Sequence, residues 1–234
     1  MPIPFEEAFT SFISALDAIA VGVFAVTGAL VASRKEMDIF GFALLGTVTG
    51  VGGGTVRDLL LGNLPVFWVK NPAYAAIALT VSAVVYFTAH IPESRYRLLL
   101  WLDAVGLSLV CVIGADKGLS AGVGAFIAIV MGVITAVFGG IIRDVLGGES
   151  PVILRREIYV IPAMLGAMAF VAITSFGATY PVAAMLGFAL CFIVRGLALY
   201  YGWSLPPYKS RPGRRASEVA PQQDPPGDGN ETTR

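Results

Sequence analysis

Two similar motifs carry the residues of this chain that could do chemistry. Residues 52–58 read GGGTVRD and residues 138–144 read FGGIIRD, so each places an Arg–Asp pair shortly after a glycine run inside an apolar segment. Glycine weakens a helix locally, and a helix broken there would free backbone carbonyls that could face water or cations. Charged side chains at bilayer depth cost roughly 2.5–3.5 kcal/mol each on insertion scales, so they pair or face water. The motifs favour passage of an ion or a solute.

Each feature also has a purely structural interpretation. Glycines let helices approach tightly, and buried charges can form an ion-pair network that fixes helix packing. Adjacent residues lie about 100° apart around a helix, so we expect Arg57 to find a carboxylate on another helix, either Asp17 or Asp103. The candidate pathway residues are Gly52, Gly53, Gly54, Gly139, Gly140, Thr49 and Thr135. The candidate charged network consists of Arg57, Asp58, Arg143, Asp144, Asp17 and Asp103.

Enzymatic chemistry finds little support in the residues. The chain has one histidine and two cysteines, so it offers no Ser/His/Asp set, no HExxH motif and no cysteine cluster. The stretch GVGGGTVRD lacks the lysine of a phosphate-binding loop. Net charge is zero, which gives no sign of a nucleic-acid partner. We expect no enzyme, no cofactor and no fixed metal site.

The composition indicates that the segments carrying these motifs lie in a membrane. Of 234 residues, 56% are hydrophobic and only 14% are charged, whereas soluble domains carry about 25% charged residues. A membrane-spanning helix needs roughly 20 apolar residues. Seven apolar segments lie near 13–33, 39–62, 72–90, 98–115, 121–147, 157–175 and 181–202. We therefore predict an all-α integral membrane domain of seven transmembrane helices over residues 5–203, with a disordered cytoplasmic tail over 204–234.

The loops differ in charge from one side to the other. Ten Lys and Arg residues follow segments one, three, five and seven, against Lys70 and Lys117 on the opposite side. Cytoplasmic loops carry the excess of basic residues in membrane proteins. The pattern predicts an N-terminus outside and a C-terminus in the cytoplasm.

The motifs belong to an internal repeat with an offset of 86 residues. Residues 16–65 match residues 102–151 at 17 of 50 positions, including LDA, Gly-Gly, Arg-Asp and proline in one register. The repeats extend over about 13–90 and about 98–175, with an extra helix over about 181–202. Each repeat holds three helices, which is an odd number. The second repeat therefore enters the membrane from the side opposite to the first. Such inverted repeats often place a pathway at their pseudo-twofold axis, between interrupted helices.

The doubled GGGTVRD/GGIIRD motif, on the second helix of each three-helix repeat, resembles the prokaryotic branch of the trimeric intracellular cation (TRIC) channels, a bacterial family also labelled putative glycine transporter. The resemblance implies a homotrimer in the bacterial inner membrane, among membrane lipids, with one K⁺- and Na⁺-conducting pore in each protomer. It assigns the pore to helices two and five, kinked at Gly52, Gly53, Gly54, Gly139 and Gly140. Animal relatives carry a lysine-containing first motif implicated in lipid binding, which this chain does not have.

Three functions follow as hypotheses. The leading one is a passive monovalent cation channel that holds K⁺ or Na⁺ only transiently. The second is a secondary transporter of a small solute such as glycine, whose carboxylate would sit at half-helix N-termini. The third is a structural membrane protein with a dry interior.

Overall fold

The computed structural model describes residues 5–92, 94–155 and 157–206, and their side chains from residue 13 onward. The elements in chain order are α1 (Phe5–Arg34), α2 (Ile39–Leu61), α3 (Phe67–Lys70), α4 (Ala73–Thr88), α5 (Arg95–Ser120), α6 (Ala125–Leu146), the 3₁₀ turn η1 (Val152–Leu154), α7 (Val160–Ser175) and α8 (Tyr180–Tyr201). The predicted disordered tail falls almost wholly outside the described residues.

The helices are consistent with an all-helical membrane protein. Within the described residues, five helices are long and apolar enough to cross a membrane, namely α1, α2, α5, α6 and α8, while α4 and α7 are apolar helices of 16 residues. Every predicted apolar segment overlaps one of these seven helices. The number of membrane crossings stays a prediction. Residues 116–120, which lie between two of the predicted apolar segments, instead continue α5 to Ser120.

Local signals explain several helix ends. The Asp38 carboxylate accepts a hydrogen bond from the Gly41 N–H at 2.8 Å and caps α2, and Ser94 caps α5 through the Arg97 N–H. Helix α2 ends at Gly62, whose φ of 70° suits glycine, and α8 ends in the same way at Gly202.

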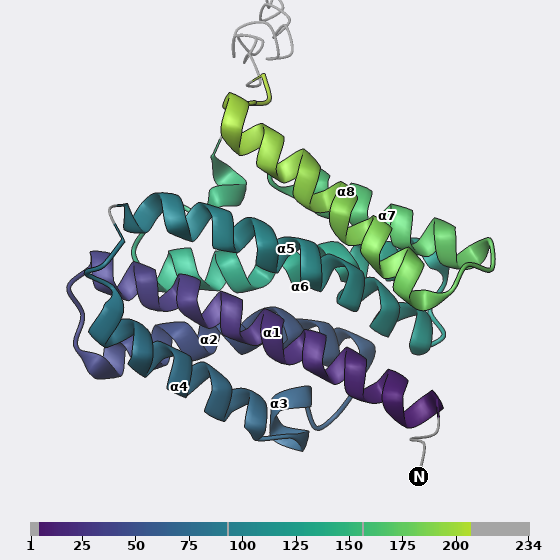
Figure 1. Ribbon diagram of the computed structural model, residues 1–234, viewed down its shortest axis with the longest axis horizontal. Helices are drawn as coiled ribbons and strands as arrows, with labels where there is room; N and C mark the ends of the chain where they lie inside the picture. Colours follow the sequence, from purple (N-terminus) through teal and green to yellow (C-terminus); the bar gives the residue numbers. More distant parts are fainter. Residues whose placement is uncertain (1–4, 93, 156, 207–234) are drawn as a thin grey trace, which may run out of the picture.

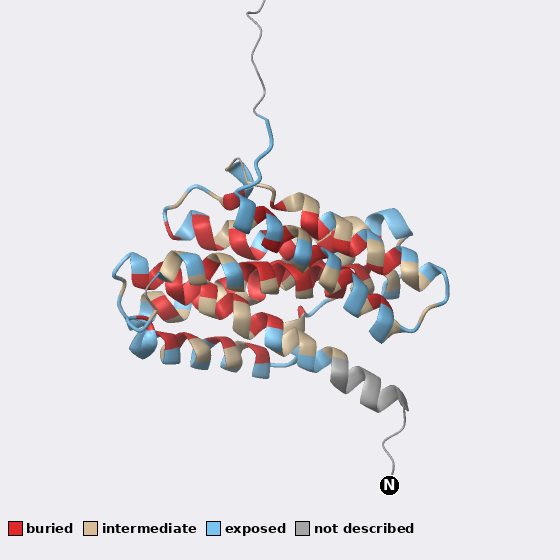
Figure 2. Ribbon diagram, turned by 45° about the horizontal axis from the view of Figure 1, so that its top comes forward, coloured by how far each residue is buried: buried red, intermediate tan, exposed pale blue. Residues whose placement is uncertain are grey.

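The two repeats pack against each other through their equivalent helices. Helix α2 contacts α6, and α1 contacts α5, while α4 packs on α1 and α2 and α7 packs on α5 and α6. Helix α8 lies on α5 and α7, at the far side from α4 (Figure 1). Buried residues run along the middle of the bundle and exposed residues line its outer helices (Figure 2). The core of the molecule is therefore the junction between the two repeats.

Glycines set how closely α2 and α6 cross. A Cβ on Gly53 would collide with the backbone carbonyl oxygen of Thr135, and a Cβ on Gly139 would lie 2.9 Å from the carbonyl oxygen of Thr49. Residues 53 and 139, like 49 and 135, differ by the repeat offset. The contacts are reciprocal, as a twofold relation between the two helices requires.

Both glycine-rich helices run through their glycines without interruption: the structure assigns 39–61 and 125–146 as single α-helices. The break expected from the sequence is therefore wrong, although a kink within a continuous helix stays a prediction. Free carbonyls are costly in an apolar interior. Here the close packing of α2 on α6 leaves each helix its own hydrogen bonds.

Candidate functional site

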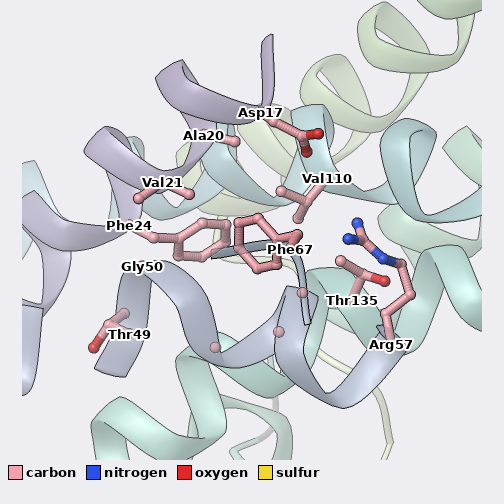
Figure 3. A pocket seen from close by; sticks show the side chains of 13 residues that line it. Asp17, Ala20, Val21, Phe24, Thr49, Gly50, Arg57, Phe67, Val110 and Thr135 are labelled. Atoms are coloured by element: carbon pink, nitrogen blue, oxygen red, sulfur yellow. The ribbon is translucent and has the colours of Figure 1, made fainter. Parts of the chain in front are cut away.

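A small cavity lies beside the crossing of α2 and α6, between α1 and α5, and Phe67 of α3 closes one side of it. Its lining residues are Asp17, Ala20, Val21, Phe24, Thr49, Gly50, Gly53, Gly54, Arg57, Phe67, Val110, Thr135 and Gly139 (Figure 3). Seven of these belong to the predicted site. The cavity thus brings together residues from both repeats.

The cavity is narrow. Its volume is about 20 Å³, and one water molecule needs about 10–15 Å³. Figure 3 shows the rings of Phe24 and Phe67 among the side chains that line it. The space therefore holds about one water and is too small for a cation with several waters of hydration.

The threonines of the site have their hydroxyls engaged within their own helices. The Thr49 hydroxyl donates to the Leu45 carbonyl at 2.5 Å, and the Thr135 hydroxyl donates to the Met131 carbonyl at 2.6 Å. Both side chains are buried. Each hydroxyl oxygen keeps lone pairs for a second partner, so the pair could present oxygen atoms at the cavity wall.

The first Arg–Asp motif forms a pair between neighbours in sequence. Arg57 Nε and Nη2 both contact Asp58 Oδ1, at 2.9 and 2.8 Å. The other oxygen, Asp58 Oδ2, accepts the Phe67 N–H at 2.8 Å. The prediction that Arg57 pairs with Asp17 or Asp103 is wrong, because its long side chain folds back onto the adjacent carboxylate.

The second motif repeats this geometry and adds to it. Arg143 Nε donates to Asp144 Oδ1 at 2.9 Å, and Asp144 Oδ2 accepts the Val152 N–H at 2.9 Å. Arg143 Nη1 also donates to Asp103 Oδ1 at 2.8 Å and to the Thr27 hydroxyl at 3.1 Å. Arg143 therefore links three helices, and its pairing with a carboxylate on another helix matches the expectation made for Arg57.

The aspartates of the two motifs also anchor the loops that follow. The Asn63 N–H donates to the Asp58 carbonyl, and the Glu149 N–H donates to the Asp144 carbonyl, each at 2.8 Å. The glycines just before these donors, 62 and 148, both have positive φ. Sequence reasoning found the twinned glycines and prolines but missed that they build one twinned turn fixed by the motif aspartate.

The remaining predicted residues lie outside the cavity lining. A Cβ on Gly52 would meet Ile142 of α6 at 3.0 Å. A Cβ on Gly140 would meet the Tyr159 hydroxyl at 2.9 Å and Asp103 at 3.6 Å. Gly140 therefore leaves room for the polar cluster around Arg143. Sequence reasoning missed Thr27, Phe24, Phe67 and Tyr159, because none of these residue types is distinctive in an apolar helix.

Known proteins share the sequence and the fold of this chain. The family model described as glycine transporter matches residues 14–90 and again residues 100–175. A solved structure of the TRIC trimeric intracellular cation channel orthologue from Rhodobacter sphaeroides is 61% identical, with a TM-score of 0.81, covering 82% of this chain and 100% of that one. The chain belongs to the TRIC family.

Other TRIC relatives agree. A structure from work on conductance through TRIC cation channels is 32% identical, with a TM-score of 0.76, and covers 90% of this chain and all of its own. The UPF0126 inner membrane protein YadS of Escherichia coli K12 is 41% identical over 198 residues, which are 82% of this chain and 94% of YadS. A UPF0126 membrane protein of Vibrio cholerae is 38% identical over 203 residues, which are 85% of this chain and 84% of that protein.

Proposed function

We propose that this protein is a passive channel for the monovalent cations K⁺ and Na⁺, with a pore in each protomer of a homotrimer. The observation that carries the proposal is the cavity at the crossing of α2 and α6, which both repeats line and to which Asp17 and Arg57 contribute charge. Identity of 61% to a TRIC channel orthologue supports the same function.

The charges around the crossing favour cations over anions. The six charged residues of the predicted network include four aspartates and two arginines, so their formal sum is negative. Each arginine is already paired with the aspartate that follows it. An arginine beside a cation route is therefore compatible with cation passage, because its charge is neutralised locally.

The protein would lie in the bacterial inner membrane, as the YadS relative does by its name. We assign seven crossings, with the N-terminus outside and the C-terminus in the cytoplasm. The basic loops support this, since Arg34 and Arg155 both lie over the ring of Tyr96, at 4.8 and 6.0 Å, and both pair with Glu149. Loops after α1 and η1 and the start of α5 thus meet at one end of the bundle.

The narrow cavity corresponds to a non-conducting arrangement. A route through the crossing requires the cavity to widen, because its volume of about 20 Å³ holds about one water.

Purified protein in planar bilayers under a KCl gradient tests the proposal directly. We expect unitary currents whose reversal potential follows the K⁺ gradient, and none from mock-purified membranes. A reversal potential that follows chloride, or silence at every voltage, would contradict it. A detergent-corrected mass of three chains is expected for the assembly, and a mass of one chain would refute the trimer.

A transporter of a zwitterion such as glycine is the second candidate. A carboxylate and a guanidinium that do not pair with each other, Asp17 and Arg57, face one cavity, which is the arrangement that an ammonium and a carboxylate would need. Saturable uptake of labelled glycine into proteoliposomes without ionic current would favour this candidate. Silence in both assays would instead favour the structural role.

A further inference from the structure

The two repeats use the same three charged residues differently. By the 86-residue offset, Asp17 corresponds to Asp103, Arg57 to Arg143, and Asp58 to Asp144. In the second repeat the arginine contacts both aspartates, whereas in the first it contacts only the neighbouring one. One carboxylate of the six-residue network is therefore left without an ion pair among the described side chains, and it is Asp17.

The second repeat is sealed around its arginine. Arg143 is fully buried and Asp103 is 1% exposed, and their atoms Nη1 and Oδ1 lie 2.8 Å apart. The Tyr159 hydroxyl lies beside Gly140 in the same cluster. No atom of Arg143 or Asp103 lines the cavity. The Arg143 guanidinium therefore occupies the place beside Asp103 where a free cation could otherwise bind.

One sequence difference and one shift of position between the repeats explain why the first does not close in the same way. Thr27, which accepts a hydrogen bond from Arg143, corresponds to Ile113, which has no acceptor to offer Arg57. By the same offset Val152 corresponds to Val66, so the N–H that binds the motif aspartate comes one position later in the first repeat, from Phe67.

The Phe67 ring then holds the first arginine in place. The Arg57 guanidinium carbon lies 5.6 Å from the centre of this ring, within the range of a cation–π contact. Phe67 thus retains Arg57 beside Asp58, and the space next to Asp17 stays available (Figure 3).

We infer that the carboxylate of Asp17 is the cation-binding group of the pathway, one per chain, and that Arg143 fills the corresponding place in the second repeat. The inference rests on the proposed channel function and deepens it. Asp17 is half-buried and lines the cavity together with Thr49 of α2 and Thr135 of α6. Asp17, Arg57 and Asp58 sum to a single negative charge, and so does the set that adds the neighbouring Lys117 and Asp116, so one monovalent cation would balance the site.

The decisive variant is Asp17→Asn, measured by K⁺ conductance as a function of KCl concentration. Fixed charge in a low-dielectric cleft raises local counter-ion concentration by factors of 10 or more, so we expect roughly tenfold lower conductance at low KCl. Asp17→Glu should restore most of it. The matched control is Asp38→Asn, which keeps the N-cap of α2 and lies outside the cavity lining, and its conductance should stay within about twofold of wild type.

A second variant copies the sealed repeat onto the first. Phe67→Val together with Ile113→Thr removes the ring that holds Arg57 and supplies the missing hydroxyl. We expect Arg57 to close on Asp17 and conductance at low KCl to fall as it does in Asp17→Asn. A double variant that conducts as wild type would contradict the role assigned to Phe67 and Ile113.

Equilibrium binding separates this inference from the proposed function. Radioactive rubidium, used as a K⁺ probe on purified protein, should bind at one site per chain in wild type and should not bind to Asp17→Asn. If the wild type conducts and Asp17→Asn has the same conductance and rubidium binding, the inference is overturned and the channel function is retained. Absence of wild-type current with rubidium binding that depends on Asp17 would overturn the channel and retain the site.

Discussion

Replacing Gly53 by alanine tests the crossing of α2 and α6 at its tightest point. The new methyl group would fall well inside 3.0 Å of the Thr135 carbonyl oxygen, a distance that real Cβ atoms essentially never show. That oxygen is part of the backbone and cannot rotate away, so the helices must separate. Overpacking of this kind costs about 1–3 kcal/mol. Alanine regains up to about 1 kcal/mol in helix propensity.

The net expectation for Gly53→Ala is a loss of about 1–2 kcal/mol in the free energy of unfolding. The equivalent Gly139→Ala should lose less, because its Cβ would lie 2.9 Å from the Thr49 carbonyl oxygen, only just inside 3.0 Å. Gly22→Ala is the matched control, since its Cβ would make ordinary contacts at 3.9 and 4.0 Å. It should be neutral or slightly stabilising.

Equilibrium unfolding in mixed micelles, followed by tryptophan fluorescence, measures these differences. The order expected is Gly53→Ala least stable, then Gly139→Ala, then Gly22→Ala. Should Gly53→Ala prove as stable as Gly22→Ala, the helices would not be held together by close contact, and the glycines would require another explanation.

Three further predictions concern charges and caps. Arg143→Gln should destabilise the protein by about 3–5 kcal/mol in the same assay, because it leaves Asp103 and Asp144 buried without a counter-charge; a loss below about 1 kcal/mol would contradict this pairing. Arg34→Gln removes a partly exposed ion pair and should change the stability by less than about 1 kcal/mol, so a larger loss would be unexpected. Ser94→Ala removes the N-cap of α5 and should cost about 1 kcal/mol, measurable as a lower unfolding midpoint, whereas Ser94→Asp should retain it.

The helices and their pairing into repeats could be predicted from the sequence. Apolar segments long enough to span a bilayer have few alternatives to helix, because every backbone group must be satisfied internally. The match of Gly-Gly, Arg-Asp and proline in one register predicted the internal repeat, but not the turns that Asp58 and Asp144 anchor. Short elements such as α3 and η1 escaped because three or four residues carry no periodic signal.

The details of the site could not be predicted in the same way. The sequence places Arg57 and Asp58 on different faces of a helix, but a long arginine side chain spans that angle, and only its surroundings decide its direction. Those surroundings include Phe67 and Ile113, which come from other elements. The uninterrupted course of α2 likewise depends on its tight contact with α6, which no local propensity reveals.

The buried arginine of α8 constrains how the protein is assembled in the membrane. Arg195 is 1% exposed, donates to the Ile158 carbonyl at 2.8 Å and to Glu157 at 3.0 Å, and lies over the Tyr159 ring. All three partners precede α7 in the chain, so they are synthesised before α8 leaves the ribosome. When α8 leaves the translocon, the partners of Arg195 are therefore already in place. The guanidinium can pair with them directly and need not cross the lipid unpaired.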